Sequence, residues 1–193
     1  MPNGCLDLFH RASADACRTR LIMHPTLSYH EVLAFDPIAP RDATLVLDHA
    51  RSLQRAAAAG ELRASLRGRK LGLLCEAGDD DDCDGDAALF RRAAVELGAH
   101  VAHIRPSLTE LSTLPEVQRT ARMLGRLYDA IECQGMAADL VHQVGVEAGV
   151  PVYDGVASPK HPTARLADLL DGNASKSDKR RFVLQAVLLS TIA

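Results

Sequence analysis

Six aspartates lie close together between a short apolar stretch and a predicted helix: Asp79, Asp80, Asp81, Asp82, Asp84 and Asp86. The apolar stretch 70–75 is typical of a buried strand, and a helix is predicted to begin near Ala87. The amino end of a helix after a strand is a natural anion site, because its free N–H groups carry partial positive charge. Here that position is filled with carboxylates. They favour a solvated acidic turn that stabilises the helix dipole, or alternatively a site for a cation.

The cation alternative rests on Asp80, Asp82 and Asp84, which with Gly85 match the opening D-x-D-x-D-G of a calcium loop. The pattern then fails, because its twelfth position holds Arg91 where a bidentate glutamate is needed. The eight histidines and five cysteines have no metal-ligand spacing and no C-x-x-C pair. We therefore predict no metal centre and no cofactor, and we interpret Cys75 and Cys133 as core residues.

The composition narrows the function classes further. The chain has 193 residues, 47% of them hydrophobic, and a formal net charge of −3. This predicts one core of ordinary size and no broad basic surface, so nucleic acid is not an expected partner. No apolar run approaches the length of a membrane span, and widely spaced cysteines are typical of a reducing compartment. We expect a cytoplasmic protein without membrane contacts.

Apolar runs and helical patterns alternate along the chain, as in α/β proteins. We predict strands at 71–75, 100–104, 130–133 and 150–153, and helices at 43–59, 87–97, 115–127, 137–148 and 163–170. This order predicts a three-layer fold, with a parallel sheet of about four strands flanked by helices. In such a fold ligands bind beyond the carboxyl ends of the strands. The loops at 76–86, 105–114, 134–136 and 154–162 should therefore build any site.

The chain divides into four predicted regions. Residues 1–35 form an N-terminal extension of uncertain order, and residues 36–171 form the α/β domain. Residues 172–178 are small and polar, as in an exposed linker. Residues 179–193 form a final helix with apolar side chains around much of its circumference, so this helix must pack on the domain or on a partner.

Several segments together suggest a family. They are LRGRKL at 66–71, Phe90, ELGAHV at 96–101, TARML at 120–124, YDAI at 128–131, VPVYDG at 150–155, HPT at 161–163 and LADLL at 166–170. In this order they resemble the carbamoyl-phosphate-binding domain of the aspartate and ornithine carbamoyltransferases. The final helix, with RRF at 180–182, is similar to the C-terminal helix of these enzymes. The resemblance implies that the amino-acid-binding domain is missing and that residues 172–178 replace it.

The resemblance also places the family's active-site positions. Its phosphate-binding loop, Ser-Thr-Arg-Thr-Arg, corresponds here to Cys83, Asp84, Gly85, Asp86 and Ala87. A further family arginine corresponds to Gln134, and the motif His-Pro-x-Gln keeps His161 but has Ala164 in place of glutamine. His161 is thus the only retained catalytic candidate, and a structural role for it, holding the loop before the helix, is the alternative.

These departures predict a carbamoyltransferase-like protein without catalytic activity, because both loop arginines that would bind phosphate are lost, at Gly85 and Ala87, and aspartates surround these positions. We expect an assembly or regulatory subunit in amino-acid or pyrimidine metabolism. Because members of the family form trimers, the resemblance implies a homotrimer or a mixed assembly with a true carbamoyltransferase. The alternative is a residual carbamoyltransferase, or a small-molecule or cation binder that uses His161 and the acidic loop.

Overall fold

A computed structural model describes residues 39–75, 85–105, 107–109 and 112–192. The predicted N-terminal extension 1–35 lies outside the described residues, as do Cys83 and the aspartates at 79–82 and 84.

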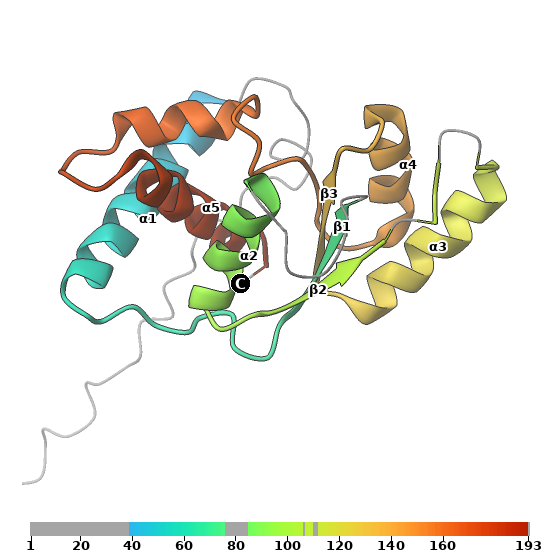
Figure 1. Cartoon of the computed structure of the whole chain (residues 1–193), viewed down its shortest axis with the longest axis horizontal. Coiled ribbons are helices and arrows are strands. Elements are labelled where there is room, and N and C mark those ends of the chain that lie inside the picture. Colours follow the sequence, from blue (N-terminus) through green and yellow to red (C-terminus); the bar gives the residue numbers. More distant parts are fainter. Residues whose placement is uncertain (1–38, 76–84, 106, 110–111, 193) are drawn as a thin grey trace, which may run out of the picture.

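Four parallel strands form the centre of the molecule, as predicted (Figure 1). They are β1 (Lys70–Cys75), β2 (His100–Ile104), β3 (Ala130–Gln134) and β4 (Val152–Asp154). The order across the sheet is β2-β1-β3-β4, so β1 and β3 are the inner strands and their side chains are almost all buried. Continuous apolar runs such as that of β1 are expected where both faces of a parallel sheet are covered.

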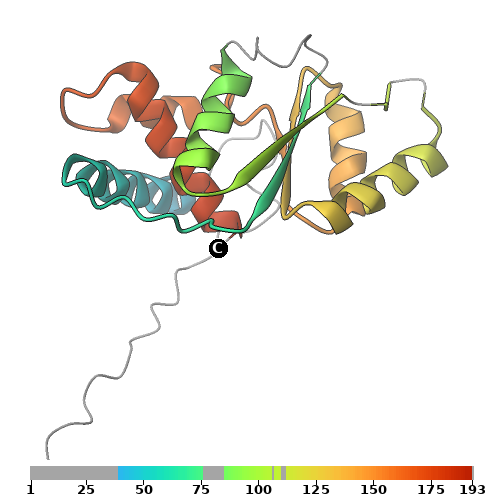
Figure 2. The same ribbon diagram turned by 60° about the horizontal axis from the view of Figure 1, so that its bottom comes forward.

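Helices cover both faces of the sheet and make the predicted three layers. One layer contains α1 (Pro40–Ala58), α2 (Asp86–Glu96), the 3₁₀ helix η1 (Pro162–Leu169) and α5 (Lys176–Ile192). The other contains α3 (Leu114–Leu127) and α4 (Ala138–Ala148). In Figure 2 the strands run between the group with teal α1 and red α5 and the pair of yellow α3 and orange α4. Each layer has its own apolar cluster against the sheet.

The C-terminal helix α5 packs back on the domain, as expected from its composition. Its contacts are with α1, α2 and η1, and the side chains from Phe182 to Leu188 are all buried. The helix begins at Lys176, which is earlier than predicted and within the presumed linker. The reason is a cap, in which the backbone N–H of Asp178 donates to Ser175 Oγ at 3.1 Å and the Ser175 hydroxyl donates to the Asp178 carboxylate at 2.7 Å.

Two other elements differ in detail from the prediction. Helix α1 begins at Pro40, because a proline fits the first helical turn. The predicted helix 163–170 is the 3₁₀ helix η1, which starts at Pro162.

Helices α3 and α4 approach closely at Gly125, where an added Cβ would lie 1.8 Å from the carbonyl oxygen of Ala148. Among the described residues, no helix has both the length and the apolar character needed to cross a membrane.

Candidate functional site

The carboxyl ends of the strands bring together several of the predicted site residues. Gln134 ends β3, Asp86 begins α2, and His161 caps the amino end of η1. Arg180 reaches the same region from α5 and donates a hydrogen bond to the carbonyl oxygen of Ala157, in the loop that follows β4. The sheet, α2, η1 and α5 therefore all contribute to this edge. The contribution of α5 was not predicted.

His161 is buried and held by its neighbour Thr163. The backbone N–H of Thr163 donates to His161 Nδ1 at 3.3 Å, and the Thr163 hydroxyl lies 2.8 Å from the same nitrogen. Burial, with a smaller effect of Arg180, lowers the pKa of His161 to about 4. The ring is therefore neutral at pH 7, and because Nδ1 accepts a hydrogen bond its proton lies on Nε2.

Of the positions that correspond to the phosphate loop, the structure describes Gly85, Asp86 and Ala87, and the only charged side chain among these three is acidic. Gly85 is the N-cap of α2 with a φ of 79°, and Asp86 lies in the first helical turn. The carboxylate of Asp86 is thus placed at the positive end of the helix dipole, where it is stabilised. Ala87 is buried in the apolar cluster with α1 and α5, so this position belongs to the core.

The two other substituted positions also offer little to an anion. Gln134 is half-buried, and its side-chain amide donates to Glu132 Oε1 at 3.3 Å. Ala164, in η1, carries only a methyl group where the resemblance implies a glutamine. Neither position supplies positive charge to the edge of the sheet.

A buried carboxyl group, that of Glu132 on β3, was not among the predicted site residues. The side chain has no exposed surface, and the backbone N–H of Val156 donates to its Oε2 at 3.4 Å. Burial raises the pKa of Glu132 well above its ordinary value, and burial also raises that of nearby Asp154. In the sequence, the only sign of this buried group is an acidic residue inside an apolar run. The same pattern is expected for an exposed residue of an edge strand. Glu132 ties β3 to the loop that leads to His161.

Arg180 is a half-buried cation at this edge. It is attracted by Asp86 and by Asp168, while burial lowers its pKa. Its guanidinium also contacts the carbonyl oxygen of Ala157. A phosphate group would have to compete with both carboxylates for this arginine.

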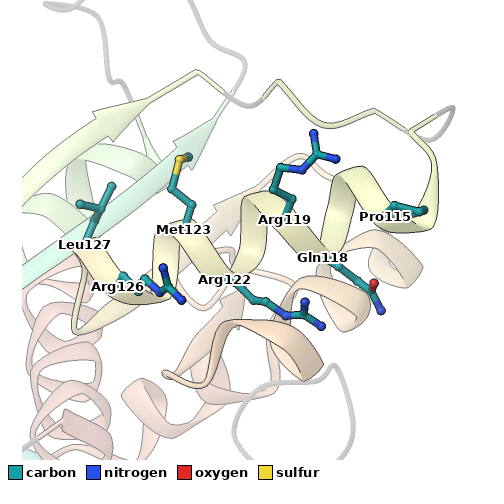
Figure 3. A pocket seen from close by; sticks show the side chains of 7 residues that line it. All are labelled: Pro115, Gln118, Arg119, Arg122, Met123, Arg126 and Leu127. Atoms are coloured by element: carbon teal, nitrogen blue, oxygen red, sulfur yellow. The ribbon is translucent and has the colours of Figure 1, made fainter.

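A shallow groove of about 660 Å³ lies elsewhere, along the outer face of α3 (Figure 3). Its lining consists of Pro115, Gln118, Arg119, Arg122, Met123, Arg126 and Leu127. Arg119 and Met123 point to one side in this view, and Gln118 and Arg122 point to the other. Arg122 Nη2 lies 2.7 Å from Glu147 Oε2 on α4. The groove contains none of the predicted site residues.

The cation alternative is not tested by the structure. Its aspartates, Asp80, Asp82 and Asp84, lie outside the described residues. Within the described ranges, no group of three or more His, Cys, Asp or Glu side chains could hold a metal ion.

Comparison with known proteins identifies the relatives. Residues 87–172 match the family model "Aspartate/ornithine carbamoyltransferase, carbamoyl-P binding domain". The chain is 38% identical over 132 residues to the catabolic ornithine carbamoyltransferase of Chromobacterium violaceum, which covers 68% of this chain and 38% of that protein. It is 37% identical over 130 residues to the ornithine carbamoyltransferase of Actinobacillus pleuropneumoniae serotype 5b, covering 67% of this chain and 38% of that protein. The chain thus spans well under half the length of these relatives.

Solved structures show the same fold. The ornithine carbamoyltransferase of Pyrococcus furiosus superimposes with a TM-score of 0.60 at 22% identity, covering 75% of this chain and 45% of that one. The enzyme of Thermus thermophilus gives a TM-score of 0.57 at 24% identity, covering 75% of this chain and 47% of that one.

Proposed function

We propose that this chain is a subunit without transfer activity in the family of the aspartate/ornithine carbamoyltransferases. The chain belongs to this family, because residues 87–172 match its carbamoyl-P-binding domain. Its role is in assembly or regulation, as a homotrimer or together with an active carbamoyltransferase. The observation that carries the proposal is that the described phosphate-loop positions, Gly85, Asp86 and Ala87, hold no cation and place the carboxylate of Asp86 in the first turn of α2.

Electrostatics support the loss of phosphate binding. A phosphate charge about 6 Å from a carboxylate is repelled by about 0.7 kcal/mol at the dielectric constant of water, and by several times more in a partly buried site. Asp86 is the described carboxylate nearest to the start of α2, and Gln134 stands where the resemblance implies an arginine. Transfer of a carbamoyl group needs stabilisation of developing negative charge, which neither residue supplies.

His161 fits a structural role in the proposal. Its Nδ1 accepts from Thr163, and the Thr163 hydroxyl lies 3.3 Å from the carbonyl oxygen of Val156. These contacts join the loop after β4 to the start of η1. A neutral, buried imidazole holds this turn without needing a substrate.

The α3 groove supports an assembly role. Its side chains Met123 and Leu127 are 52% and 55% exposed, and Leu114 at the start of the same helix is 57% exposed. Apolar groups between arginines are typical of the surfaces that proteins bury against partners. We propose this face of α3 as the contact with the partner subunit.

The first test is an activity assay. The purified chain is incubated with carbamoyl phosphate and ornithine, and separately with aspartate, beside an active ornithine carbamoyltransferase as positive control. We expect no carbamoylated amino acid and no heat of binding for carbamoyl phosphate in calorimetry. Measurable turnover would refute the proposal and favour a residual carbamoyltransferase.

The second test concerns assembly. Light scattering after size-exclusion chromatography should give the mass of a trimer, or of a mixed complex when an active carbamoyltransferase is added. The double variant Met123→Glu, Leu127→Glu should weaken the complex, because charge is placed in the apolar part of the groove. Val146→Glu, at a 68% exposed position on α4, is the matched control. A monomer at all concentrations, with no complex in the mixture, would contradict the assembly role.

A further inference from the structure

The α3 groove holds three arginines, and only one of them has an ion-pair partner in the described part of the chain. That one is Arg122, whose Nη2 lies 2.7 Å from Oε2 of Glu147 on α4. Arg119 and Arg126 are exposed and form no ion pair with a described carboxylate. Glu116 attracts Arg119, but its carboxylate is already used in the cap of α3. Two arginines of the groove are thus free to pair with a partner.

Apolar side chains lie next to these arginines. Met123 and Leu127 line the same groove and are exposed, and Figure 3 shows Met123 on the same side of α3 as Arg119. When a partner covers such a surface, water leaves it and the effective dielectric constant falls. An ion pair formed there is then stronger than one on an open surface. The groove therefore favours a partner that carries carboxylates.

The described surface of a second copy offers little of this kind. A contact of α3 with α3 across a two-fold axis would place the arginines of both grooves against each other, and like charges at an interface cost binding free energy. Several described carboxylates already have a cation of their own chain. Asp48 Oδ1 lies 3.2 Å from Arg51 Nη1, and Asp129 Oδ1 lies 2.9 Å from Arg69 Nη1.

The acidic stretch 79–84 has the charge that the groove lacks. Residues 71–90 contain no lysine or arginine, and the stretch holds five aspartates, Asp79, Asp80, Asp81, Asp82 and Asp84. These residues lie outside the described part of the chain, but β1 before them ends at Cys75 and α2 after them begins at Asp86. Both points are at the carboxyl edge of the sheet, whereas the groove is on the outer face of α3.

We propose that the α3 groove binds the acidic stretch 79–84 of a second copy of this chain. Arg119 and Arg126 pair with aspartates of that stretch, which also covers Met123 and Leu127. The contact joins two different surfaces, so each copy uses its groove with one neighbour and its acidic stretch with another, and three such contacts close a ring. The inference rests on the assembly part of the proposed function and not on the absence of transfer activity.

The first experiment reverses the charge of the groove in the full chain. The double variant Arg119→Glu, Arg126→Glu should raise the Kd of self-association, measured by sedimentation equilibrium, at least about tenfold. The control is Arg63→Glu, Arg67→Glu, at exposed positions between α1 and β1, which changes the net charge equally. It should leave the Kd within about twofold. Added salt should weaken the association of the unchanged chain, because screening reduces the attraction between the charges.

The second experiment tests the pairing itself. Asp80→Lys, Asp82→Lys should weaken self-association as the groove variant does. A chain that carries both reversals should regain it, because every contact again joins opposite charges. Circular dichroism shows whether each variant is folded. If the chain with both reversals associates no better than either double variant, the two segments are not partners and the inference is overturned.

The outcomes also separate this inference from the assembly role. Self-association that neither reversal changes would overturn the inference and would support an assembly role through another surface. A monomer at all concentrations would overturn the inference as well, including the case in which the acidic stretch binds the groove of its own chain. A mixed complex with an active carbamoyltransferase would then still support the assembly role, and its absence would refute both.

Discussion

The contact between α3 and α4 at Gly125 allows a sharp test of the fold. In Gly125→Ala the new Cβ would lie 1.8 Å from the carbonyl oxygen of Ala148 and 2.8 Å from its carbonyl carbon. An ordinary carbon–oxygen contact needs about 3.3 Å, so the helices would have to separate by roughly 1.5 Å. The obstacle is backbone and cannot rotate away.

The expected magnitude follows from two opposing effects. Replacing glycine by alanine inside a helix stabilises it by about 1 kcal/mol. Overpacking usually costs about 1–3 kcal/mol, and the upper end applies because a backbone atom obstructs the new methyl group. We therefore expect Gly125→Ala to lower the free energy of unfolding by about 2 kcal/mol, the difference between these two effects.

The matched control is Gly145→Ala in α4, where the nearest atom to an added Cβ is the Cβ of Val152 at 3.8 Å. This variant keeps the helix gain without the clash, so it should be more stable than the unchanged protein by up to about 1 kcal/mol. Urea unfolding followed by circular dichroism measures both. If Gly125→Ala were as stable as Gly145→Ala, the close helix contact and the reasoning from it would be wrong.

Three further substitutions test other parts of the structure. Glu132→Gln removes a carboxyl group whose pKa is raised by burial in the folded state. Because folding favours the protonated carboxyl group, the unchanged protein loses stability as the pH rises above the ordinary pKa of 4.5, whereas the variant does not. The thermal midpoint of the variant relative to that of the unchanged protein should therefore increase from pH 5 to pH 8. A constant difference across this range would contradict the buried carboxyl group. Ser175→Ala removes the α5 cap and should cost about 1 kcal/mol in urea unfolding, whereas no loss would mean that the cap does not fix the helix start. Leu188→Ala empties a fully buried position of α5 and should cost about 2–5 kcal/mol in the same measurement, and a cost below 1 kcal/mol would show that α5 is loosely packed.

The predictable part of the fold is the part that depends on short apolar runs. Strands such as 71–75 are flanked in the sequence by residues that mark clearly where the strand ends. The helices predicted between the strands then indicate a parallel sheet. The start of α5 was placed too late because Ser175 and Asp178 have the composition of a linker, while their hydrogen bonds make them a cap. The helical type of η1 was not predictable, since i, i+3 spacing suits both 3₁₀ and α helices.

The site was predictable only where a local motif marks it. His161 stands next to proline, before the helix that it caps, so its place at the carboxyl edge follows from the chain order. Glu132 and Arg180 depend on contacts between distant segments, such as that of Arg180 with Ala157.

The position of α5 also has a consequence for how the chain folds. The layer of α3 and α4 is built from neighbouring segments, whereas the opposite layer joins α1 to α5 across most of the chain. Contacts between near segments close short loops and form sooner than those between distant ones. We expect the α3–α4 side to act as the early nucleus, and the α1 side to become ordered only once residues 176–192 have been synthesised and docked.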